Sequence, residues 1–388
     1  MENRPELYEA FDGFTYYPNT ASFAQHTLMA VPALWGGFEY TPMEMNKRNT
    51  VTQREKHNQA LLLLPTILAD LDYEVTVTDP SWSNYEWISD VTIYNNLNNI
   101  KAFNTIGRYT SYWFQENPFG DVQVISNTIK RNSFFFSFVK IIIPPLRFVI
   151  YDKGSYWGAA NQDDFITDFI DNYAVLNYLP KLTSLESSKS QALLITNETA
   201  HQPFILQYPD YKPVPEVTDF GPEPFSFNKS YHINAAMIIQ LGRWFEELKK
   251  QGVYDNTRII IVADHGANLD AYIADEPISI PDERREKYNP LLLVKDFYSN
   301  GKLLVDNTFM TNADVPLLAL KGIVDNPVNP FTGNTLSDDY KKDGIYITTN
   351  HRPMAADHGK FQFNIKNDQW IFVKDNIFES SNWKKVEK

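Results

Sequence analysis

The segment Arg258-Ile-Ile-Ile-Val-Ala-Asp-His-Gly266 decides the fold. Residues 258–262 predict a buried strand, because the four residues after Arg258 are β-branched and continuously apolar and the run is too short for a buried helix. Asp264 and His265 follow it directly, and Gly266 allows the chain to turn sharply. In open α/β sheets, ligands bind beyond the carboxyl ends of the strands, where this pair is expected. A carboxylate beside a neutral imidazole suits zinc or manganese, although a polar strand end with a capping Asp would have the same sequence.

Helical and strand patterns alternate on both sides of this segment. Residues 52–71 predict an amphipathic helix, residues 73–78 a strand, and residues 231–251 a long helix just before the Asp264 strand. We therefore expect an α/β fold in which helices sandwich a largely parallel sheet. Further predictions are helices at 161–174 and 313–320, strands at 191–196 and 289–295, and a loop-rich insertion at 81–125.

The sequence pattern changes beyond residue 320. Turns rich in Gly, Asn and Asp separate short alternating segments at 345–349, 360–365 and 369–374, which predict a small antiparallel sheet. We expect two domains, a catalytic domain at 1–320 and a C-terminal subdomain at 321–388.

Composition excludes several classes of protein. Lys and Arg total 35 against 48 for Asp and Glu, a net charge of −13, which argues against nucleic-acid binding. A small phosphorylated substrate is compatible with this charge if a metal holds it. The chain has no cysteine, so disulfides and thiolate chemistry are excluded. No signal peptide opens the chain, and its most apolar stretch, 134–151, is too interrupted by charges and prolines to span a membrane, so we expect a soluble chain.

Residues 254–266, preceded by a long helix, resemble the alkaline phosphatase superfamily and in particular its sulfatase and phosphotransferase branch. The resemblance implies that Asp264 and His265 bind the catalytic metal. The segment 25–34, Gln-His-Thr-Leu-Met-Ala-Val-Pro-Ala-Leu, is similar to the Thr-x-x-x-Val-Pro pattern of the phosphoethanolamine transferases. In those enzymes the residue matching Thr27 is the nucleophile, and lipoteichoic acid synthases also use a threonine. The formylglycine motif of true sulfatases is absent from the sequence.

The chemistry of Thr27 agrees with this resemblance. A threonine hydroxyl is a weak nucleophile unless a metal or a base removes its proton. At a helix N-terminus it also feels the positive end of the helix dipole, which favours an alkoxide and an incoming phosphate. The alternative is that Thr27 only caps the helix.

A third segment, residues 195–204, resembles the His-x-Pro-Phe/Tyr element of the same transferases. The resemblance implies that His201 contacts the substrate phosphate or protonates the leaving group, which an imidazole can do near neutral pH. A structural hydrogen bond at a strand end is the alternative.

Other side chains are candidates for substrate binding. Trp157 falls where lipoteichoic acid synthases have a substrate-contacting tryptophan, although Ala159 stands at their arginine position. His351, Arg352 and His358 could line the substrate cleft, with Arg352 as a phosphate clamp, or form a solvated loop. Two further histidines, His57 and His232, lie in helical patterns and are expected to be structural.

The resemblance implies metal-dependent transfer or hydrolysis of a phosphate-ester head group through a phospho-threonine. We expect one divalent ion, zinc or manganese, with magnesium or calcium as alternatives, and a phosphorylated or lipid-linked small substrate. A sulfate or phosphate monoester hydrolase and a non-catalytic relative are alternatives. The superfamily has a strand with an acidic metal ligand before the nucleophile, and residues 1–26 contain none. We therefore expect a truncated form of a membrane-anchored, extracytoplasmic protein.

Overall fold

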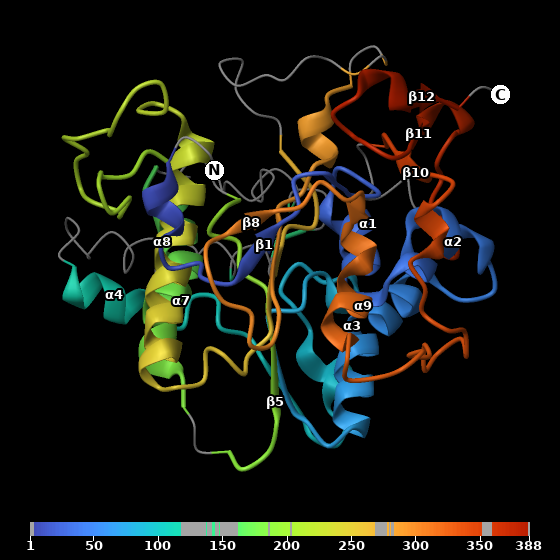
Figure 1. Ribbon diagram of the computed structural model, residues 1–388, viewed down its shortest axis with the longest axis horizontal. Coiled ribbons are helices and arrows are strands. Elements are labelled where there is room, and N and C mark those ends of the chain that lie inside the picture. The colour runs from blue at the N-terminus through green and yellow to red at the C-terminus, as the bar shows by residue number, and fades with distance from the viewer. Residues whose placement is uncertain are drawn as a thin grey trace. The chain divides into compact units, whose positions relative to one another are not determined.

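The computed structural model describes most of the chain, and Figure 1 shows its elements. The described residues are 4–117, 137, 142–143, 147, 162–184, 187–201, 204–267, 278, 280, 283–350 and 359–386. They form two compact units: the first contains Met1–Asn104, Ser184–Thr196 and Phe245–Lys388, and the second contains Thr105–Thr183 and Asn197–Trp244. None of the helices in these ranges is both long and apolar enough to span a membrane.

The strand before Asp264 belongs to a four-stranded mixed sheet of the first unit. Its order is β6 (Ile259–Val262), β7 (Leu292–Lys295), β1 (Phe14–Tyr16) and β8 (Leu304–Val305). Strand β7 runs antiparallel to both neighbours, whereas β1 and β8 are parallel. The strands predicted around β6 and β7 are confirmed. The short β1 was not predicted, because three residues are too few to show a pattern.

Parallel pairing dominates two other sheets of this unit. Strand β3 (Glu74–Thr78) lies between β4 (Ile100–Phe103) and β5 (Gln191–Ile195), parallel to both. Strand β2 (Thr20–Ala21) pairs in parallel with β9 (Met310–Thr311). Strand β4 lies in the region predicted to be a loop-rich insertion, so that prediction was wrong at this position.

The C-terminal region forms the small antiparallel sheet that the sequence predicts. It consists of β10 (Ile345–Thr348), β11 (Trp370–Val373) and β12 (Trp383–Lys385). The α/β class with this added sheet is confirmed. The strand predicted at 360–365 is wrong, since these residues contain only an isolated bridge at Phe363. Side chains hold that segment instead: Asn46 accepts from the Phe363 N–H at 2.7 Å and donates to its carbonyl at 2.9 Å.

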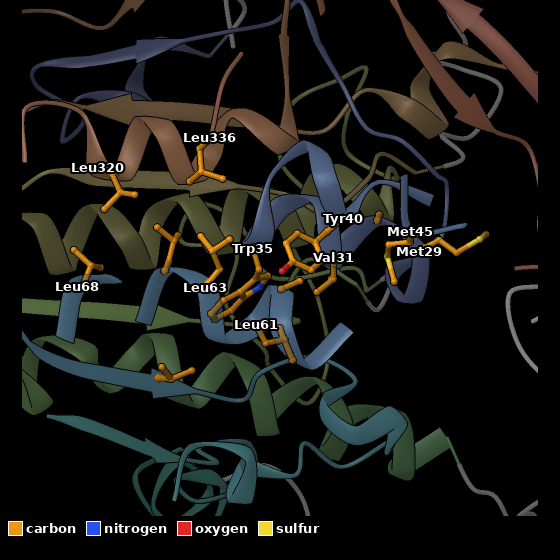
Figure 2. Packing of buried hydrophobic residues seen from close by; sticks show 14 of the residues in the cluster. Met29, Val31, Trp35, Tyr40, Met45, Leu61, Leu63, Leu68, Leu320 and Leu336 are labelled. Carbon is orange, nitrogen blue, oxygen red and sulfur yellow. The ribbon is translucent and has the colours of Figure 1, made fainter. Parts of the chain in front are cut away.

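The described residues of the first unit include the helices α1 (Thr27–Gly36), α2 (Pro42–Lys47), α3 (Gln53–Asp70) and α9 (Val315–Leu320). Helix α3 begins where the Thr52 hydroxyl accepts from the Glu55 N–H at 3.1 Å, a typical N-cap. Helix α1 is apolar on almost every face and is buried against α3, and Figure 2 shows Trp35 between Leu61 and Leu63. Because α1 is fixed by this packing, its first residue, Thr27, has a defined position.

The long elements described in the second unit are helices. This unit contains α4 (Thr110–Glu116), α7 (Gln162–Leu182) and the part of α8 (Lys229–Lys250) up to Trp244. Helices α7 and α8 are joined by a 2.8 Å hydrogen bond from the Gln240 side chain to the Tyr173 hydroxyl. The helix predicted at 231–251 is confirmed, and Gly252, with φ of 74°, follows its end.

Candidate active site

Hydrogen bonds hold strand β6 at both of its ends. At its start, Arg258 donates to the Asp296 carboxylate at 2.6 Å and to the Ala319 carbonyl at 2.9 Å. At its end, the Ala263 N–H donates to the Leu291 carbonyl at 3.0 Å. The chain therefore leaves β6 in a fixed direction, and the next residues are Asp264 and His265.

Two hydrogen bonds from backbone N–H groups hold the turn that follows β6. The His265 N–H donates to Asp264 Oδ1 at 2.9 Å, and the Gly266 N–H donates to the Lys287 carbonyl at 3.0 Å. Position 266 requires glycine because a Cβ atom there would lie 1.8 Å from the Glu286 carbonyl oxygen. The predicted role of this glycine in the turn thus has a steric cause, the close approach of a neighbouring backbone.

Three predicted site residues meet at this turn. Thr27 Oγ1 lies 3.4 Å from His265 Nε2, and the same nitrogen lies 3.5 Å from Asp264 Oδ2. The side chains of His265 and Asp264 retain 22% and 25% of their exposure, so the cluster remains accessible to a small ligand. The N-cap position of α1 belongs to His26, whose ring centroid is 6.4 Å from that of His265. Thr27 therefore does not serve as the helix cap.

Hydrogen bonding assigns the state of His265. Its Nδ1 lies 2.6 Å from the Gly266 carbonyl oxygen, which can only accept, so Nδ1 carries the hydrogen. In the neutral ring Nε2 then has a lone pair directed at Thr27 and Asp264. Asp264 Oδ2 is buried and has no hydrogen-bond partner among the described residues.

These atoms fit a divalent cation. A neutral imidazole nitrogen, an unpaired carboxylate oxygen and a hydroxyl oxygen are a mixed nitrogen and oxygen donor set, which zinc and manganese accept more readily than magnesium or calcium. A buried carboxylate oxygen without a partner is costly, and a cation would relieve that cost. Within the described ranges, no group of three or more His, Cys, Asp or Glu side chains is placed to hold a metal. Beside Asp264 and His265, the hydroxyl of Thr27 supplies a third donor atom, which is of another residue type.

The remaining candidates have different outcomes. His201 lies in the second unit, is exposed, and donates its backbone N–H to the Glu198 carbonyl at 2.9 Å. Its catalytic role stays a prediction. The proposed substrate-binding residues lie outside the described residues: Trp157, His351, Arg352 and His358.

The two histidines expected to be structural are completely buried. His57 Nε2 lies 2.9 Å from the Ser81 carbonyl oxygen, and His232 Nε2 lies 2.8 Å from that of Ser226. Burial lowers the pKa of both side chains, that of His57 to about 4. Both rings are therefore neutral hydrogen-bonding groups of the interior.

Sequence reasoning missed Asn312, which contacts the site residues directly. Its side chain is fully buried and its Nδ2 donates to the Asp264 carbonyl at 2.7 Å. The sequence Thr-Asn-Ala-Asp at 311–314 contains a capping box, which agrees with the helix predicted from residue 313. It contains no signal for a contact with a residue 48 positions earlier.

Comparison with known proteins identifies the fold. The sequence matches no family model and no curated protein sequence. The structure is similar to that of a sulfatase of Bacteroides thetaiotaomicron, solved in work on the metabolism of multiple glycosaminoglycans. The TM-score is 0.51 at 12% identity, covering 95% of this chain and 77% of that chain.

The chain has a sulfatase-like fold.

Two further solved structures show weaker similarity to it. The lipoteichoic acid synthase LtaP of Listeria monocytogenes has a TM-score of 0.46 at 12% identity, covering 97% of this chain and 83% of that chain. The phosphonate monoester hydrolase of Silicibacter pomeroyi has a TM-score of 0.44 at 12% identity, covering 95% of this chain and 79% of that chain. The sulfatase-like fold agrees with the superfamily that the Asp264-His265 segment resembles.

Proposed function

We propose that this chain is a metal-dependent enzyme of the sulfatase-like branch of the alkaline phosphatase superfamily. It transfers or hydrolyses a phosphate-ester head group through a phospho-threonine on Thr27. One observation carries the proposal: Thr27 Oγ1 lies 3.4 Å from His265 Nε2, although the two residues are 238 positions apart. A hydroxyl at a helix start, beside a lone-pair nitrogen and an unpaired carboxylate oxygen, is suited to nucleophilic catalysis.

The reaction has two displacements at phosphorus. Thr27 Oγ gives up its proton and attacks the phosphorus atom, the bond to the leaving oxygen breaks, and the leaving oxygen takes up a proton as the alcohol departs. Water or an acceptor alcohol then gives up its proton and attacks the phospho-threonine, the bond from phosphorus to Thr27 Oγ breaks, and Thr27 Oγ takes up a proton as the phosphoryl group is transferred. The N-terminus of α1 favours the negative charge of both the alkoxide and the phosphate.

Asp264, His265 and Thr27 would hold the cation, with zinc or manganese best matched to these atoms. When bound, it supplies a Lewis acid that polarises the phosphate ester and favours ionisation of the hydroxyl. The hydrogen bond from His265 Nδ1 to the Gly266 carbonyl orients the imidazole ring and keeps Nε2 available as an acceptor.

His201 is proposed as the residue that contacts the phosphate or gives a proton to the leaving oxygen. The proposal also includes a phosphorylated or lipid-linked small substrate and an extracytoplasmic location. All of these rest on the sequence resemblance. The absence of a formylglycine motif favours a phosphate ester over a sulfate ester as substrate.

Replacement of Thr27 tests the proposal. We expect Thr27→Ala to lower turnover of bis(4-nitrophenyl) phosphate, with zinc or manganese supplied, by about a thousandfold or more, because no other hydroxyl replaces the nucleophile. Thr27→Ser should keep part of the activity. Mass spectrometry of acid-quenched wild-type enzyme should find a 4-nitrophenyl phosphoryl group on the peptide containing Thr27, since one of the two ester groups of the substrate leaves in the first step.

Thr52→Ala is the matched control, because Thr52 is a true helix N-cap. This variant should lose about 1 kcal/mol of folding stability and keep its turnover. Undiminished turnover by Thr27→Ala would remove Thr27 from the mechanism. A wild-type protein that binds neither zinc nor manganese and turns over no phosphate ester would be the non-catalytic relative.

A further inference from the structure

Asn312 lies in a rigid segment next to the site. It is the first residue of the 3-10 helix η7 (Asn312–Asp314), directly after β9. The Thr311 N–H donates to Asp314 Oδ2 at 2.8 Å, and the Tyr340 hydroxyl donates to Asp314 Oδ1 at 2.7 Å. Lys341 adds an ion pair of 2.7 Å to the same carboxylate. The backbone that carries Asn312 is therefore fixed independently of β6.

The orientation of the Asn312 amide is determined by its partner. The Asp264 carbonyl oxygen can only accept, so the atom 2.7 Å from it must be Nδ2. The opposite atom, Oδ1, is buried and has no hydrogen-bond partner among the described residues. A buried acceptor without a partner is costly.

The bond to Asp264 acts on the peptide unit between the two proposed metal ligands. The Asp264 carbonyl and the His265 N–H belong to one planar group, and that N–H also donates to Asp264 Oδ1 at 2.9 Å. Rotation of this group would displace the side chains of both residues, and with them the approach of His265 Nε2 to Thr27 Oγ1. From this geometry we propose that Asn312 is a positioning residue, which fixes the 264–265 peptide so that His265 Nε2 stays beside both Thr27 Oγ1 and Asp264 Oδ2.

The expected effect of Asn312 on metal binding rests on the proposed function. Its effect on the position of the 264–265 peptide can be tested without metal. Asn312→Ala removes the bond. Asn312→Asp keeps the shape and Oδ1 but replaces the donor with an acceptor that faces the Asp264 carbonyl. Asn329→Ala is the matched control: Asn329 is also fully buried in the first unit, and its side chain bonds to Glu39 and Tyr40 instead of the β6 turn.

The first measurement is hydrogen–deuterium exchange of the metal-free proteins, followed in peptides covering residues 259–267. We expect the His265 and Gly266 amides to exchange about tenfold faster in Asn312→Ala and Asn312→Asp, with no change in Asn329→Ala. Unchanged exchange in Asn312→Ala would overturn the positioning role, whatever the protein does with metal.

The second measurement is zinc affinity by isothermal titration calorimetry. Both Asn312 variants should bind zinc about 10–100-fold more weakly than wild type, as expected when a ligand loses its supporting hydrogen bond. Zinc affinity of Asn312→Asp equal to that of wild type would overturn the role of Nδ2. If wild type binds neither zinc nor manganese and turns over no phosphate ester while exchange responds to Asn312, the proposed function fails and the positioning of the 264–265 peptide stands.

Discussion

Thr27 and Thr52 both lie at the start of a helix, yet their surroundings differ. The Thr52 hydroxyl accepts a backbone N–H of its own helix, whereas the Thr27 hydroxyl faces His265. The sequence alone cannot distinguish them, because a Thr at a predicted helix start is equally compatible with an N-cap. At the residue scale, function here depends on which neighbour a side chain meets.

Gly266 offers a test of the close packing beside the site. Gly266→Ala would place Cβ 1.8 Å from the Glu286 carbonyl oxygen, a backbone atom that cannot move aside alone. We expect a loss of about 1–3 kcal/mol or more in the free energy of unfolding, measured in urea. At Gly252 a Cβ would have nothing within 4 Å, so Gly252→Ala should lose only about 1 kcal/mol from its positive φ. Equal losses in the two variants would contradict the steric explanation.

Helix α3 shows how an element can bury polar groups that the site does not use. Lys56 is fully buried and its ammonium donates to the Phe361 carbonyl at 2.7 Å and to the carbonyls of Met45 and Arg48. The next residue of the helix, His57, is also buried and forms a hydrogen bond with the Ser81 carbonyl. These contacts join α3 to α2 and to the segment around residue 361, so they are structural.

Burial of His57 predicts a pH dependence of stability. Desolvation lowers its pKa from 6.5 to about 4 in the folded state, so folding favours the neutral ring. Its contribution is therefore present above pH 6.5 and is lost as the pH falls towards 4. Between pH 7 and pH 4.5 wild type should lose about 2–3 kcal/mol more stability than His57→Gln, whose amide can still donate to Ser81.

Urea unfolding at several pH values measures this difference. His201→Gln is the control, since His201 is exposed and its replacement should leave the acid dependence as in wild type. Parallel pH profiles for wild type and His57→Gln would show that His57 is not responsible.

In the first unit, the C-terminal sheet shares a core with the segment that leads to Thr27. Thr348 donates its N–H to the Phe23 carbonyl at 3.0 Å, and Asn19 bonds to the Asp375 carbonyl at 2.8 Å. One apolar cluster contains residues from the N-terminal segment, the region before β7 and the C-terminal sheet: Phe23, Ala33, Tyr288, Ile345, Ile347, Ile371, Val373 and Trp383. The sheet therefore supports the position of α1.

Removal of residues 321–388 tests the predicted division into domains at 1–320 and 321–388. The deletion takes away six large buried side chains of this cluster, the five named above and Ile377, each of which contributes about 1.5–3 kcal/mol. Their sum, about 10 kcal/mol or more, is comparable to the stability of a typical domain. We expect residues 1–320 alone to lose cooperative thermal unfolding, followed by circular dichroism. A cooperative transition near that of the full chain would instead show an independent domain ending at 320.

Long periodic segments were predictable because the signal is local. The patterns at 52–71 and 231–251 specify α3 and α8, and the β-branched run at 258–262 specifies β6. Strands of two or three residues, such as β1 and β8, carry too few side chains for a pattern, and pairing with distant partners alone defines them. The segment at 360–365 alternates like a strand, but Asn46 binds its backbone at Phe363 instead of a neighbouring strand.

The sequence by itself determined the α/β class, the small antiparallel C-terminal sheet, and the residue types suited to a metal and a nucleophile at Thr27, Asp264 and His265. These properties follow from side-chain periodicity and short motifs, which act over a few residues. Only the tertiary structure decided that Thr27 Oγ1 lies 3.4 Å from His265 Nε2 and that Asn312 holds the Asp264 carbonyl. Such meetings depend on how buried helices and strands pack, since residues far apart in the chain have no local energy that would bring them together.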